Sequence, residues 1–202
     1  AVNIGLTHTG VYSSVSKVAD QSNGSVTITG TTARYTPADG FYGTDTFPYR
    51  ASGPGGNSPT LTVTVTVAPP PAPGAGNVSA STAYETAVNI ALTPSGVYSS
   101  VAKVGDPSRG SVTISGTTAR YTPEAGFYGT DSFTYRAAGP GGNSPTRTVT
   151  VTVGTPPAPN AGNVSATTAY ETAVNIALTP SGEYTSVALG SAPANGSASL
   201  TG

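Results

Sequence analysis

Two carboxylates stand in the same short motif at two places in the sequence. Asp45 and Asp131 each follow a Gly-Thr pair and open an Asp-x-Phe-x-Tyr run, which ends at Tyr49 or Tyr135. A carboxylate at the entry to a strand can accept bonds from backbone N–H groups and so hold the preceding loop. It can also supply oxygen ligands to Ca²⁺. We expect the structural role for both carboxylates and for the two tyrosines that follow them.

Calcium stays open as the alternative for these carboxylates. Glu85 and Glu171, each alone after a proline-rich stretch, would join Asp45 and Asp131 as the candidate ligands. Ca²⁺ takes roughly six to eight oxygens, usually from closely spaced acidic residues. The sequence contains no Asp-x-Asp pair and no acidic pair beside the proline-rich stretches. We therefore predict no cofactor and no metal site, with calcium as the one exception worth testing.

Two Gly-Phe-Tyr-Gly loops carry the aromatic side chains best placed to meet a ligand. Tyr42 and Tyr128 follow Phe41 and Phe127 in these loops. An exposed tyrosine on a loop can stack on a sugar ring, so both are possible glycan contacts. We expect instead that each phenylalanine closes the end of its domain and that the tyrosine covers it.

The composition excludes several classes of function. The chain has 202 residues, of which only 8% are charged, and its 8 Lys and Arg nearly balance its 9 Asp and Glu. Without a basic stripe, neither nucleic acid nor an anionic membrane surface is expected as a partner. No apolar run approaches the roughly 20 residues of a membrane helix. The chain lacks Cys and Met. We interpret it as a processed product or fragment, and the Thr-, Ser-, Gly-, Ala- and Val-rich composition favours the outside of a cell.

One motif occurs three times at a constant spacing. AVNIGLTHTGVYSS at Ala1 returns as AVNIALTPSGVYSS at Ala87 and as AVNIALTPSGEYTS at Ala173, an offset of 86 residues each time. Residues 1–86 align with 87–172 without a gap, and about four-fifths of the positions are identical. Such self-similarity indicates tandem duplication of one structural unit. His8, the one histidine, is replaced by proline in both later copies, which speaks against a catalytic imidazole.

Proline-rich stretches divide the chain into predicted domains. APPPAPGAG begins at residue 68 and GTPPAPNAG at residue 154, and such segments are typical of semi-rigid linkers. We predict a first repeat at residues 1–67, which lacks its first strand, and a complete repeat at 76–153. The N-terminal half of a third repeat follows at 161–202. The linkers between them are residues 68–75 and 154–160.

The apolar pattern within the complete repeat has period two. Val88, Ile90 and Leu92 alternate with small or polar residues, and the last strand reads Thr-Arg-Thr-Val-Thr-Val-Thr-Val from Thr146. Together with Gly-rich turns, this pattern predicts about seven short strands in an all-β antiparallel sandwich. Pro48 replaces Thr134 of the later copy and cannot donate to a strand ladder, so we expect its position to face an edge or a bulge.

The run RYTPEAGFYGTDSFTYRAAGPGGNSPTRTVTVTV, with the linker and the AVNIAL strand, resembles the tandem bacterial Ig-like (cadherin-like) repeats of large surface proteins. The resemblance covers the complete repeat and recurs in the first copy. In immunoglobulin-like sandwiches a corner tyrosine stands two residues before a strand cysteine. Here Tyr135 takes that place and Ala137 replaces the cysteine, so packing must supply what a disulfide would.

The resemblance implies a non-catalytic, extracellular structural repeat at a bacterial surface, a stalk, spacer or filament-forming segment involved in adhesion or biofilm. Its partners would be the neighbouring repeats of the same chain, with no nucleic acid and no membrane insertion. Two alternatives stay open. One is a carbohydrate-binding repeat that contacts surface polysaccharide through Tyr42 or Tyr128. The other is a fibre or sheath subunit that self-associates laterally, which near-zero net charge would permit.

Overall fold

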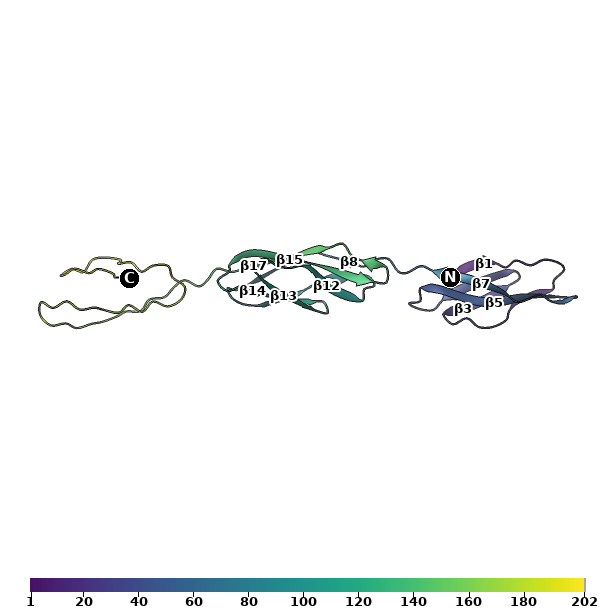
Figure 1. The fold of residues 1–202 in the computed structure, drawn as a ribbon, viewed down its shortest axis with the longest axis horizontal. Helices are drawn as coiled ribbons and strands as arrows, with labels where there is room; N and C mark the ends of the chain where they lie inside the picture. The colour runs from purple at the N-terminus through teal and green to yellow at the C-terminus, as the bar shows by residue number, and fades with distance from the viewer. Residues whose placement is uncertain (202) are drawn as a thin grey trace. The chain divides into compact units, whose positions relative to one another are not determined.

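The computed structural model describes residues 1–201, and these contain strands but no helix (Figure 1). Consequently no helix in this range could cross a membrane. Contacts divide the chain into two compact units. The first is Ala1–Gly74 with Pro94–Ser100 and Ala137–Pro145, and the second is Ala75–Thr93 with Val101–Arg136 and Thr146–Gly202. The second copy therefore contributes two segments to the first unit.

The first copy forms two antiparallel sheets. One has the order β1-β4-β3, and in the other β5 pairs with β2, β6 and β7. The strands are β1 (Val2–Gly5), β2 (Ser14–Lys17), β3 (Gly24–Thr29), β4 (Thr32–Pro37), β5 (Gly43–Gly53), β6 (Gly56–Asn57) and β7 (Leu61–Val67).

The second copy repeats both sheets and adds strands before them. Its three-stranded sheet has the order β10-β14-β13, and its larger sheet has the order β12-β15-β17-β9 with β16 beside β15. The added strand β9 pairs in parallel with β17, with Val78 opposite Val149. The strands are β8 (Gly74–Ala75), β9 (Val78–Thr82), β10 (Val88–Ala91), β11 (Pro94–Ser95), β12 (Ser100–Gly105), β13 (Gly110–Ser115), β14 (Thr118–Pro123), β15 (Gly129–Gly139), β16 (Gly142–Asn143) and β17 (Arg147–Val153).

The core of the second copy lies between its two sheets. Alternation buries one face of each strand, so Val149, Val151 and Val153 point inward while the threonines between them face outward or are partly covered. The cluster contains residues of both layers: Ile90, Leu92, Val112, Ala119, Tyr121, Phe133, Tyr135, Val149, Val151 and Val153. The predicted all-β sandwich with about seven main strands is thus confirmed.

A two-residue loop fixes the register of the β13–β14 hairpin. Ser115 pairs with Thr118, so Gly116 and Thr117 make the turn. Gly116 has a φ of 57°. A positive φ at the first central position is what a type II′ turn requires, and its twist matches that of the strands.

Pro48 shortens the edge strand β2 of the first copy. Its carbonyl still accepts a bond from the Val18 N–H at 2.9 Å, so its missing N–H faces the same neighbour, the edge strand β2. That strand ends at Lys17, whereas β12, which faces Thr134, continues for two further residues to Gly105. Pro48 thus lies in the central strand β5, with its missing N–H toward the end of the edge strand β2, and the shorter β2 is the consequence.

Residues 161–201, expected as the first half of a third repeat, contain no strand. In the second copy, β10 and β9 obtain their ladder bonds from β14 and β17. The counterparts of β14 and β17 do not occur in this sequence after Ala173. The third copy therefore has no partner strands within the chain to pair with.

Candidate functional site

Asp131 is buried in the second copy and fully hydrogen-bonded by its own chain. Only 3% of its surface is exposed. It accepts bonds from the N–H and hydroxyl of Ser108, both at 3.0 Å, and from the Arg109 N–H at 2.9 Å. The Ser132 N–H at 2.8 Å and the Tyr121 hydroxyl at 3.0 Å complete the set. The carboxylate thus ties the β12–β13 loop and strand β14 to the start of β15.

Asp45 makes a smaller version of this anchor in the first copy. It accepts bonds from the N–H groups of Asn23 at 3.2 Å and Thr46 at 2.9 Å, and from the Tyr35 hydroxyl at 2.9 Å. Ser22, the counterpart of Ser108, donates no bond to it. Both carboxylates are therefore occupied by folding contacts, and Asp131 is the more heavily bonded.

Burial and a neighbouring carboxylate shift the pKa values of the two buried tyrosines, Tyr35 and Tyr121. Burial, then the hydrogen bond and negative charge of Asp45, raise the pKa of Tyr35 to about 12. Burial and Asp131 likewise raise the pKa of Tyr121. For Asp131 burial acts upward, but the three N–H donors and the Tyr121 hydroxyl outweigh it, so its pKa lies below the ordinary value. In the second copy the fold therefore favours a neutral Tyr121 beside an ionised Asp131.

Tyr135 and Tyr49 hold a different part of each sandwich. The Tyr135 hydroxyl donates to the Gly76 carbonyl at 2.7 Å and accepts from the Thr93 N–H at 3.2 Å. Tyr49 donates instead to the Thr7 carbonyl at 3.0 Å. Both rings lie in the core, so these are corner tyrosines that fasten the neighbouring backbone.

The calcium candidates do not come together. Across residues 1–201, no three His, Cys, Asp or Glu side chains lie close enough to hold a metal ion. Glu85 accepts a bond from the Gly126 N–H at 3.2 Å. Glu85 and its counterpart Glu171 share a positive φ, 50° and 53°, which is uncommon for a residue other than glycine.

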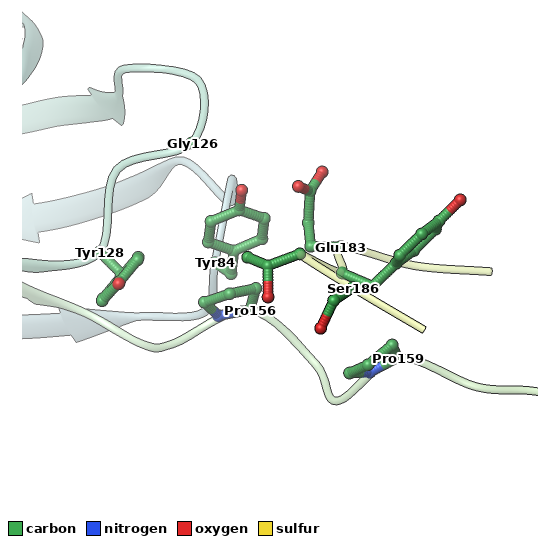
Figure 2. A pocket seen from close by; sticks show the side chains of 9 residues that line it. Tyr84, Gly126, Tyr128, Pro156, Pro159, Glu183 and Ser186 are labelled. Atoms are coloured by element: carbon green, nitrogen blue, oxygen red, sulfur yellow. The ribbon is translucent and has the colours of Figure 1, made fainter. Parts of the chain in front are cut away.

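Tyr128 lines an open hollow in the second unit (Figure 2). The hollow has a volume of about 440 Å³, and Tyr84, Pro156 and Glu183 also line it. Tyr128 is 56% exposed, whereas Phe127 packs partly buried against the core. Burial, then the charges of Glu85 and Glu183, raise the pKa of Tyr84.

Tyr42 lines the corresponding hollow of the first unit, which is smaller at about 330 Å³. Its other lining residues include Phe41, Pro70, Val97 and Pro140. Val97 stands where Glu183 stands in the third copy. The hollow at Tyr128 is therefore the one that offers both aromatic rings and a carboxylate.

Sequence reasoning missed the tyrosines that bind the two aspartates. Tyr35 and Tyr121 each precede their aspartate by ten residues in an identical Arg-Tyr-Thr-Pro segment, and that repeated separation was the available signal. It also missed Ser144, which is 6% exposed; its hydroxyl accepts from the Ala137 N–H at 2.9 Å and donates to the Pro145 carbonyl at 3.0 Å.

Comparison with known proteins places the chain in a family. The model of the bacterial Ig domain family matches residues 4–66 and 69–152. No curated protein matches the chain. Among solved structures, the chain is similar to an endo-fucoidan hydrolase of glycoside hydrolase family 107, with 17% identity over 69% of this chain and 23% of that one, and a TM-score of 0.34.

Two other structures are similar at comparable levels. The EC1-4 segment of Drosophila N-cadherin is 14% identical over 78% of this chain and 46% of that one, with a TM-score of 0.37. Domains 4-9 of the surface layer protein SbsC are 15% identical over 69% of this chain and 22% of that one, with a TM-score of 0.34. The chain spans less than half the length of each of these three structures. Since the family model matches the first and second copies in tandem, over more than half of the chain, the chain belongs to the bacterial Ig domain family.

Proposed function

We propose that the chain is a non-catalytic structural segment, a stalk or spacer, of an extracellular protein at a bacterial surface. One observation carries the proposal. Asp131, one of the two carboxylates that the sequence singles out, accepts five hydrogen bonds from its own chain and is almost fully buried. A group saturated in this way stabilises a fold and has no free oxygen to offer a substrate or a metal ion.

Repetition supports the same proposal. The first copy uses the same carboxylate–tyrosine pair and the counterparts of the same core residues. A second copy built around the same buried pair and the same core positions adds length to the protein without adding a new arrangement of reactive groups. Within this role, membership of the bacterial Ig domain family favours a surface protein engaged in adhesion or biofilm.

Force spectroscopy of the full chain, held at its two ends, tests the spacer role. A spacer must resist extension, so we expect two separate unfolding events. Unfolding residues 76–153 should release roughly 280 Å of contour length before the folded length is subtracted. Phe133→Ala should weaken or remove one event and leave the other. Extension without a measurable force peak would contradict the proposal.

A carbohydrate-binding repeat is the second candidate, favoured by the hollow that Tyr84, Tyr128 and Glu183 line. Tyrosine faces can stack on a sugar, and a carboxylate can accept bonds from its hydroxyl groups. The test is an NMR titration of the full chain with soluble dextran, xylan and β-glucan. Tyr128→Ala should abolish any shifts, whereas Tyr170→Ala, a control at a side chain 89% exposed and outside the hollow, should preserve them. The absence of shifts with all three polysaccharides would reject this candidate.

A further inference from the structure

The loop Gly139–Asn143 lies directly against the preceding proline-rich segment. A Cβ placed on Gly141 would collide with the Pro70 carbonyl oxygen, and it would lie 2.5 Å from the Pro71 carbonyl carbon and 2.7 Å from the Ala72 nitrogen. These are backbone atoms, which cannot rotate away as a side-chain end can. Only a residue without a side chain permits so close an approach.

A second glycine borders the same stretch of chain. A Cβ on Gly96 would lie 3.7 Å from the Pro73 Cα, and Gly74 meets the side chain of Ser95. Beyond this point the chain is fastened by the Gly76 N–H, which donates to the Thr93 carbonyl at 3.3 Å. Contacts with the second copy therefore extend from Pro70 to Gly76.

The third copy holds its own linker in the same place. Asn160 and Ser181, the counterparts of Gly74 and Ser95, exchange two backbone bonds of 2.9 Å. A Cβ on Gly182, the counterpart of Gly96, would lie 3.4 Å from the Pro159 Cα. The contact therefore recurs although the linker sequence differs and although this copy forms no strand.

The first copy supplies matched control positions. Gly55 and Gly10 are the counterparts of Gly141 and Gly96. Among the described residues, no atom beyond their chain neighbours lies within 4 Å of a Cβ placed on either one. The same loop sequence, Gly-Pro-Gly-Gly-Asn, thus exists here with its glycine face uncovered.

We propose that Gly141 and Gly96 form a binding seat for an extended proline-rich peptide, and that its ligand is the linker preceding the same repeat. A proline-rich segment is extended before it binds, so it loses little conformational entropy on docking. The bare glycine surface then allows backbone-to-backbone contact. The linker is accordingly part of the repeat that follows it. This inference goes beyond the proposed function, because the seat holds its peptide whatever the parent protein does.

The test compares Gly141→Ala with Gly55→Ala in the ¹⁵N-labelled full chain. Neither glycine has a positive φ, so both backbones accept alanine and only the contact differs. In the unaltered protein, heteronuclear NOE values of Ala72 and Gly74 should equal those of strand β15. Gly141→Ala should lower them to values typical of a mobile segment, and Gly55→Ala should leave them unchanged.

Mobile Ala72 and Gly74 in the unaltered protein would overturn the proposal, and so would rigid ones in Gly141→Ala. The amides of Tyr121 and Phe133 report whether the variant keeps its fold. If Gly141→Ala disturbs these amides, the double variant Pro70→Gly, Pro71→Gly provides the second test. It leaves the loop of residues 139–143 intact and removes the prolines that keep the linker extended. It must then release Ala72 in the same way, and a rigid Ala72 in that variant refutes the seat.

Discussion

Replacing Asp131 by asparagine removes the charge from a carboxylate whose two oxygens accept five hydrogen bonds. Asparagine has the same shape but one acceptor oxygen, and its amide group would face N–H donors. Bonds to a charged acceptor contribute about 1.5–3 kcal/mol each. With two or more of them lost, Asp131→Asn should lower the free energy of unfolding of the second copy by about 3 kcal/mol or more.

The first copy provides an internal comparison. Asp45 accepts three bonds and lacks the two that Ser108 donates to Asp131. Asp45→Asn should therefore destabilise the first copy less than Asp131→Asn destabilises the second, the difference being about 1.5–3 kcal/mol for each additional bond that Asp131 loses. Asp106→Asn serves as the control, because that exposed carboxylate pairs with Lys103 at the surface and should leave both copies unchanged within error.

Urea titration of the ¹⁵N-labelled full chain measures the two copies separately. Amide peaks of Tyr121 and Phe133 report on the second copy, and those of Tyr35 and Phe47 report on the first. The reasoning would be refuted if Asp131→Asn behaved like Asp106→Asn. It would also be refuted if Asp45→Asn cost more than Asp131→Asn, since stability would then not follow the number of bonds.

Three further outcomes are expected. The raised pKa of Tyr35 means that folding favours the neutral phenol. Its contribution to the stability of the first copy is therefore complete below about pH 10 and is lost as the pH rises through about 12. Tyr35→Phe should remove this loss, which urea titration at several alkaline pH values would measure. Asp131 has a lowered pKa, so its contribution to the stability of the second copy is present above about pH 4 and is lost on further acidification. In Asp131→Asn, the free energy of unfolding of the second copy should therefore depend less on pH below about pH 4. Pro48→Thr restores a ladder donor and should extend β2 toward the length of β12. The new amide at position 48 should then exchange as slowly as other strand amides, whereas a rate typical of an unprotected loop would contradict the account of the shorter strand.

The strand arrangement could be predicted because its determinants are local. Alternating valines in the last strand and glycines at the turns specify which face is buried and where the chain reverses. The missing donor of Pro48 also follows from residue type alone, although the shortening of β2 opposite it does not. The same reasoning placed Asp131 at the entry to a strand, where a carboxylate can bind backbone N–H groups.

The partners of that carboxylate could not be predicted in the same way. Tyr121 reaches Asp131 only because strands β14 and β15 lie in different layers of the sandwich, and periodicity does not specify which side chains meet across layers. The held linker was missed for a related reason. Proline and glycine predict an extended or irregular segment, but they do not indicate whether another loop covers it. The close approach at Gly141 is what shows that this linker is covered.

A thermal melt of the full chain in millimolar calcium, repeated with a chelator, tests most directly whether internal packing and the buried Asp–Tyr pairs hold each copy together. The account predicts superimposable melts, because Asp131 has no free oxygen for an ion and the described residues bring no acidic cluster together. A calcium-dependent rise of several degrees would contradict it. In that case Asp131 or Glu85 would be metal ligands, and the structural role argued for the carboxylates would be wrong.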